Sequence, residues 1–95
     1  MLDIKNLHKE KDKYEKIKLK TFNKIYDRCV REVELVNKHE NVYCHVYEIP
    51  SFISGSPTYD VKECGDFLKL KFEKGGLEVE FVNPNNLFLS WLPKS

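Results

Sequence analysis

Three cysteines and three histidines are the residues of this chain whose chemistry could support nucleophilic catalysis or metal binding. In chain order they are His8, Cys29, His39, Cys44, His45 and Cys64. A catalytic thiolate needs an imidazole within hydrogen-bonding distance, and a zinc site needs closely spaced pairs of ligands. Cys44 and His45 are adjacent, but adjacent strand residues point to opposite faces. The sequence therefore predicts neither a catalytic dyad nor a metal site, and it predicts no cofactor.

A cluster of carboxylates lies near the start of a predicted helix, at Asp60, Glu63 and Asp66. Negative side chains at this position interact favourably with the helix dipole. General acid–base catalysis would need a pocket and two groups with separate roles, and the pattern indicates neither. We therefore interpret the cluster as structural and predict that the chain is not an enzyme.

The cysteine pattern and the hydropathy of the chain bear on its location. The number of cysteines is odd, and their spacing forms neither a disulfide framework nor a CxxC pair. Free thiols are typical of a reducing intracellular compartment. No apolar run approaches the roughly 20 residues that cross a bilayer, and the charged start MLDIKNLHKEKDK lacks the apolar segment of a secretory signal. The sequence predicts an intracellular protein that is neither secreted nor embedded in a membrane.

A basic helix face is the first candidate binding surface. Lysines and arginines recur at helical spacing, at Lys13, Lys16, Lys20, Lys24, Arg28 and Arg31. Such a face could follow the phosphates of a nucleic acid. Acidic residues interrupt it, however, and i,i+4 pairs such as Asp12 with Lys16 are typical of a plain charged helix. Nucleic-acid binding is therefore the alternative prediction, and a face in contact with solvent or a protein is preferred.

An apolar loop, Glu48–Asp60, is the second candidate surface. Large apolar side chains are unusual in a solvated connection, yet this one combines several of them with two prolines and a glycine. In one interpretation Phe52, Ile53 and Tyr59 close the open edge of the core. In the other they form an exposed apolar patch for a protein partner, which Trp91 would extend. Both interpretations remain open at this point.

The basic face belongs to a long helix predicted from about residue 9 to residue 38. The stretch contains no proline or glycine, and from Ile17 onward its apolar residues recur at a spacing of about 3.6. We expect this half to pack on a core. Before Ile17 the predicted helix is nearly all Lys, Glu and Asp, so residues 1–13 are predicted to be a charged extension that projects into solvent or onto a partner. The partner could be a different protein or a second copy of the chain, in which case the protein associates with itself through this helix.

The remaining elements follow from turn residues and alternation. They are a strand at Val42–Ile49, a helix from a cap at Thr58 or Asp60 to about Lys74, and strands at Leu77–Val82 and Leu87–Leu92 that form a C-terminal hairpin. The first strand carries Val42, Cys44 and Val46 on one face and Tyr43, His45 and Tyr47 on the other. Two aromatic side chains on the second face predict that both faces are at least partly covered.

The element order α-β-α-β-β predicts a single α+β domain over residues 1–95. Both helices are expected on one face of a small mixed three-stranded sheet, in a two-layer sandwich. The crossover through the second helix is expected to be right-handed if the first two strands are neighbours. A hydrophobic share of 41% in 95 residues is enough for one core and leaves no room for a second.

Three segments carry a likeness to a known group of proteins. They are KTFNKIYDRCVREVE, EIPSFISGSPTYDVKECGDFL and GGLEVEFVNPNNLFLSWLP, and their most specific residues are Ile49, Pro50, Gly55, Pro57, Tyr59, Pro84, Leu87, Ser90 and Trp91. With these segments the chain resembles, over nearly its whole length, the small uncharacterised proteins of nucleocytoplasmic large DNA viruses. That group includes iridoviruses, phycodnaviruses and mimiviruses.

The resemblance implies a setting rather than a mechanism, because no activity is assigned to that family. The setting is a virion or a viral factory in the host cytoplasm. Together with the projecting helix, it favours a non-enzymatic protein–protein interaction module, a minor structural component of the virion whose partners are capsid or other virion proteins. The alternative is an accessory protein of genome packaging or transcription that binds nucleic acid through the lysine-rich first helix.

Overall fold

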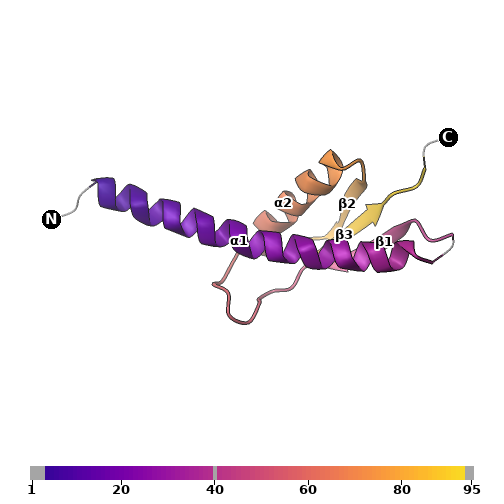
Figure 1. Cartoon of the computed structure of the whole chain (residues 1–95), viewed down its shortest axis with the longest axis horizontal. Coiled ribbons are helices and arrows are strands. Elements are labelled where there is room, and N and C mark those ends of the chain that lie inside the picture. Colours follow the sequence, from indigo (N-terminus) through magenta and orange to yellow (C-terminus); the bar gives the residue numbers. More distant parts are fainter. Residues whose placement is uncertain (1–3, 40, 94–95) are drawn as a thin grey trace.

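Two helices and a three-stranded antiparallel sheet make up the computed structural model, which describes residues 4–39 and 41–93 (Figure 1). The elements are α1 (Ile4–Asn37), β1 (Cys44–Glu48), α2 (Val61–Lys74), β2 (Glu78–Asn83) and β3 (Asn86–Ser90). The predicted α+β class, the order α-β-α-β-β, the long N-terminal helix and the C-terminal hairpin are confirmed.

The sheet has the strand order β1-β3-β2, and both outer strands are antiparallel to β3. The predicted mixed sheet is therefore wrong, and β1 and β2 are not the neighbours that the expected crossover required. β3 takes the centre because its Leu87 and Leu89 are the most deeply buried residues of the sheet. Leu87 pairs with Tyr47 of β1 on one side and with Phe81 of β2 on the other.

One face of the sheet is covered by both helices. Tyr47, Val79, Leu87 and Leu89 point into the core, where they meet buried residues of α1 and α2. α1 packs on β1 and α2, and α2 packs on β2. The prediction that both faces of β1 are covered is wrong, because Val46, next to the buried Tyr47, is 48% exposed. Strand alternation thus gives the sheet one buried face and one open face.

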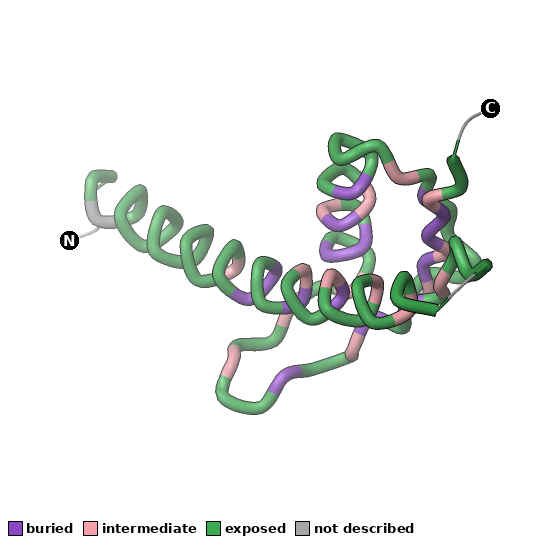
Figure 2. The backbone as a smooth tube through the Cα atoms, turned by 45° about the vertical axis from the view of Figure 1, so that its right-hand side comes forward, coloured by how far each residue is buried: buried purple, intermediate pink, exposed green. Residues whose placement is uncertain are grey.

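Helix α1 consists of two halves with different surroundings. Phe22, Ile25 and Cys29 of its second half are buried in the core. Every described side chain from Ile4 to Ile17 is exposed, and this half extends away from the sheet and from α2 (Figures 1 and 2). The molecule is therefore elongated, with extents of 62 × 28 × 22 Å. The helix starts about five residues earlier than predicted, since nothing between Ile4 and residue 9 breaks it.

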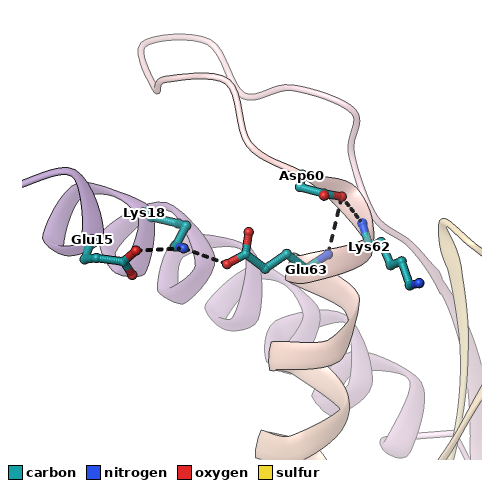
Figure 3. Close-up of polar contacts among 5 residues, drawn as sticks. All are labelled: Glu15, Lys18, Asp60, Lys62 and Glu63. Atoms are coloured by element: carbon teal, nitrogen blue, oxygen red, sulfur yellow. Dashed lines mark hydrogen bonds and ion pairs between the residues drawn. The ribbon is translucent and has the colours of Figure 1, made fainter. Parts of the chain in front are cut away.

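Local polar contacts fix the start of α2 and attach it to α1 (Figure 3). The Asp60 side chain accepts hydrogen bonds from the backbone N–H groups of Lys62 and Glu63, at 2.9 and 3.5 Å, and so caps the helix. Lys18 of α1 lies between Glu15 and Glu63, with its Nζ 3.2 and 2.6 Å from their carboxylate oxygens. Of the two caps proposed from the sequence, Asp60 is the one used.

Candidate interaction surfaces

The cysteines and histidines do not converge on a chemical site. Cys29 and Cys64 are fully buried, and burial raises the pKa of each thiol to about 12. Cys44 is exposed on the open face of the sheet, whereas its neighbour His45 points to the other face. The Nε2 atom of His45 lies 3.7 Å from Glu32 Oε1, too far for a hydrogen bond. Within residues 4–39 and 41–93 no three His, Cys, Asp or Glu side chains are grouped to hold a metal ion.

The six predicted basic residues of α1 share one solvent-facing side of the helix. They are Lys13, Lys16, Lys20, Lys24, Arg28 and Arg31, and all are exposed. By helical spacing they lie opposite the core-facing Phe22 and Cys29, and they span about 27 Å along the axis. Asp27 lies among them. Lys18 belongs to the other side of the helix, where Glu63 and Glu15 raise its pKa. We call the six residues the basic face.

The four predicted partner-binding residues do not form one patch. Ile53 is only 6% exposed and belongs to the core. The Tyr59 hydroxyl donates a hydrogen bond to the Pro50 carbonyl, and the ring packs edge-on against Phe22 with its centroid 6.2 Å away. The remaining two are Phe52, which is 68% exposed, and Trp91, whose Nε1 donates to Asn37 Oδ1 at 2.9 Å. The loop therefore uses most of its apolar residues to close the core.

An apolar stripe on the projecting half of α1 was missed by the sequence analysis. Ile4, Leu7 and Tyr14 are 70%, 42% and 58% exposed, and their spacing places them on the line of the helix that continues into the buried Ile25. Leu7 and Tyr14 also line a shallow hollow. The spacing of three and seven residues was the available signal, but a predicted start near residue 9 left Ile4 and Leu7 outside the helix. We call these three residues the N-terminal stripe.

The open face of the sheet is a second surface that the sequence analysis did not single out. Val46 of β1, Phe88 of β3 and Glu80 of β2 lie side by side on it, and Cys44, Ser90 and Glu78 form the next row. All of these residues except Val46 line a groove of about 390 Å³, which Tyr43 and Leu92 extend at its edge. We call the two rows the outer sheet face.

Comparison with known proteins gives the chain a family but no described activity. Residues 2–73 match the model of a family of unknown function, DUF5759. Over 98 aligned residues the chain is 31% identical to an uncharacterized protein of Acanthamoeba polyphaga mimivirus, with 99% of this chain and 79% of that protein covered. No solved structure matches.

The resemblance to small uncharacterised proteins of large DNA viruses is confirmed. No helix within the described part of the chain is long and apolar enough to cross a bilayer. Because the family model covers most of its length, the chain belongs to this family of unknown function, DUF5759.

Proposed function

We propose that the protein is a non-enzymatic interaction module of a large DNA virus, which binds a protein partner through the N-terminal stripe. In this proposal it is a minor structural component of the virion, assembled in the viral factory with capsid or other virion proteins. The observation that supports it most strongly is the exposed stripe of Ile4, Leu7 and Tyr14 on a half-helix that extends away from the sheet and from α2 (Figure 1).

The low stability of a short helix with an uncovered apolar side supports a binding partner for this half of α1. A helical segment of about four turns is marginal in water, and most helix stability in proteins comes from covering an apolar face. Fully burying a large apolar side chain is worth about 1.5–3 kcal/mol. Leu7 and Tyr14 are about two helical turns apart and lie on the same side of the helix, so one partner surface can cover both. A partner therefore stabilises the projecting half and gains binding energy from the same contact.

The proposal is tested with tagged protein expressed in cells infected with the encoding virus. Partners are crosslinked, purified and quantified by mass spectrometry for the wild type, for L7A/Y14A and for the matched control K13A/K16A. Alanine favours the helix in both variants, so helix propensity is not the difference between them. We expect L7A/Y14A to lose about tenfold or more of a viral partner, which corresponds to about 1.4 kcal/mol, whereas the control retains it. Equal recovery by all three proteins would contradict the proposal.

Quantitative proteomics of purified particles tests the virion assignment separately. We expect the chain to copurify with capsid proteins through density gradients at a constant ratio. If it is abundant in infected cells but absent from purified particles, the structural role in the virion is wrong, and the interaction role is left to the crosslinking experiment.

Nucleic-acid binding is a second candidate function, supported by the basic face. None of its six cations makes an ion pair or hydrogen bond with the described residues, so all are available for phosphates. Binding through them would fall steeply with salt, and the reversal K13E/K16E/K20E/K24E would abolish it, whereas K62E/K74E on α2 would have little effect. Absence of a mobility shift with duplex and single-stranded DNA at low salt would remove this candidate.

A further inference from the structure

The side of the projecting half-helix that carries the N-terminal stripe has its own set of charges. Leu7 and Tyr14 line their shallow hollow together with three charged residues, which are Glu10, Lys11 and Glu15. By helical spacing the lysines of the basic face point to the opposite side of the helix. The surface offered to a partner is therefore an apolar centre bordered by charges of both signs.

The order of these residues is nearly symmetric about the bond between Glu10 and Lys11. Leu7 and Tyr14 lie at equal distances on either side of that midpoint, and an acidic and a basic residue lie directly beside it. Two copies paired antiparallel about the midpoint bring Leu7 of each copy onto Tyr14 of the other. The same pairing brings Lys11 of each copy next to Glu10 of the other. The surface is therefore self-complementary, as a two-fold contact between identical chains requires.

The lysines on the far side of the helix do not oppose this pairing. Each helix is about 10 Å across, so the outward lysines of two paired copies are roughly 20 Å apart. That separation is more than twice the screening length of about 8 Å at physiological ionic strength. A parallel pairing would instead set Lys11 against Lys11 and Glu10 against Glu10. The charges beside the stripe thus favour the antiparallel order.

The shape of the molecule leaves room for the contact. The half-helix extends away from the sheet and from α2, and it is about 20 Å long from Ile4 to Ile17 (Figure 1). In an antiparallel pair the body of each molecule lies beyond the first residues of the other helix, so the two bodies stay at opposite ends. About four helical turns from each copy make a small interface, which is typical of a reversible association.

We propose that the partner of the N-terminal stripe is the same stripe of a second copy of the chain, paired antiparallel in a two-fold dimer. This inference rests on the proposed function and names its partner. The pairing covers Leu7 and Tyr14 of both copies at once. It leaves both basic faces and both outer sheet faces on the outside of the dimer.

Disulfide trapping tests the antiparallel order. The single variants L7C and Y14C are made in a C44S background, because Cys44 is the exposed native thiol and the other two are buried. An equimolar mixture is oxidised mildly, and intact masses distinguish the covalent dimers. We expect disulfides between positions 7 and 14 to outnumber those that join two identical positions. An excess of 7 with 7 and of 14 with 14 would overturn the antiparallel order.

A matched pair on the other side of the helix controls for random collision. Lys9 and Lys16 are exposed, have the same spacing of seven residues and lie opposite the stripe. A mixture of K9C and K16C in the same background should give few covalent dimers of any kind. Equal yields from the two mixtures would overturn the proposed contact.

Charge exchange tests the same contact without new thiols. We expect K11E and E10K each to weaken self-association about fivefold at low salt in sedimentation velocity, because each sets like charges across the contact. The double variant E10K/K11E should recover association. An equimolar mixture of the two single variants should also associate, since both of its contacts then join opposite charges. K16E on the basic face is the control and should associate like the wild type.

Failure of this inference is distinguishable from failure of the proposed function. A wild type that stays monomeric at sub-millimolar concentration and gives no linkage between positions 7 and 14 overturns the pairing with a second copy. If L7A/Y14A nevertheless loses another viral protein from infected cells, the stripe still binds a partner, and only the identity of that partner is wrong.

Discussion

At the scale of single residues, the two buried thiols link the stability of the protein to alkaline pH. Cys29 of α1 and Cys64 of α2 fill small spaces in the core and are fully buried. Because burial disfavours the thiolate, the pKa of each rises to about 12. Both thiols are neutral in the folded protein over the physiological range, which suits a packing role and not a nucleophilic one.

We predict that the free energy of unfolding falls as pH rises from about 8.5, where a thiol of the unfolded chain ionises, toward 12. Over this window the unfolded state binds fewer protons, and the slope for two thiols approaches about 2.7 kcal/mol per pH unit. Urea titrations under reducing conditions across this range measure it. C29A/C64A should be less stable near neutral pH but should show a shallower alkaline slope; parallel slopes would contradict the assignment.

A second residue-scale prediction concerns Gly65 in the middle of α2. Glycine there costs about 0.5–1 kcal/mol relative to alanine, but a Cβ atom would lie 2.8 Å from Phe81 Cε1 and 3.3 Å from Ile49 Cδ1. The helix and the sheet approach each other at this point. We expect G65V to lower the free energy of unfolding by about 1–3 kcal/mol in urea titrations. G75A, where the added Cβ meets ordinary contact distances, should change it by less than about 0.5 kcal/mol; equal effects would refute the crowding argument.

At the scale of elements, α1 combines a core helix with a projecting one. The second half supplies Phe22, Ile25 and Cys29 to the core, and Lys18 forms an ion pair with Glu63 of α2. The ion pair of Lys18 with Glu63 joins exposed side chains and adds little stability. The fold of the body therefore depends on the helix from about Lys18 onward, and the exposed Ile4, Leu7 and Tyr14 before it are accessible to a partner.

Deleting residues 1–13 tests this division. Every side chain of that segment whose burial is described is exposed, while residues 1–3 lie outside the described residues. We expect the helical signal in circular dichroism to fall while the melting temperature stays the same within error, and partner binding to be lost. F22A is the control, because losing a buried aromatic ring costs about 3–5 kcal/mol. A large drop in melting temperature on deletion would show that the helix start is structural.

Local signals predicted some elements well, and nonlocal contacts limited the rest. The cap at Asp60 and the stop at Gly75 and Gly76 gave the bounds of α2, because both act within one turn. The strand order depends on the pairing of β1 with β3, in which Tyr47 lies opposite Leu87. These residues are 40 positions apart, and no local sequence pattern specifies their pairing. The loop interpretation likewise depended on distant contacts, since the pairing of Tyr59 with Phe22 crosses from the loop to α1.

At the scale of the whole molecule, shape and charge are both uneven. The radius of gyration is 16.3 Å, compared with about 12 Å for a compact chain of this length. The excess comes from the first half of α1, in which seven lysines stand against three carboxylates. The sheet, which carries Glu78 and Glu80 on its outer face, lies in the body, so the projecting half of α1 and the sheet are well separated in space (Figure 1).

Small-angle scattering tests this shape. For the dilute protein we expect a radius of gyration close to 16.3 Å, and for the chain without residues 1–13 a value near 12 Å. A radius near 12 Å for the dilute full-length chain would mean that α1 folds back on the body. In that case the N-terminal stripe would be covered by its own molecule, and neither a viral partner nor a second copy would be needed to explain it.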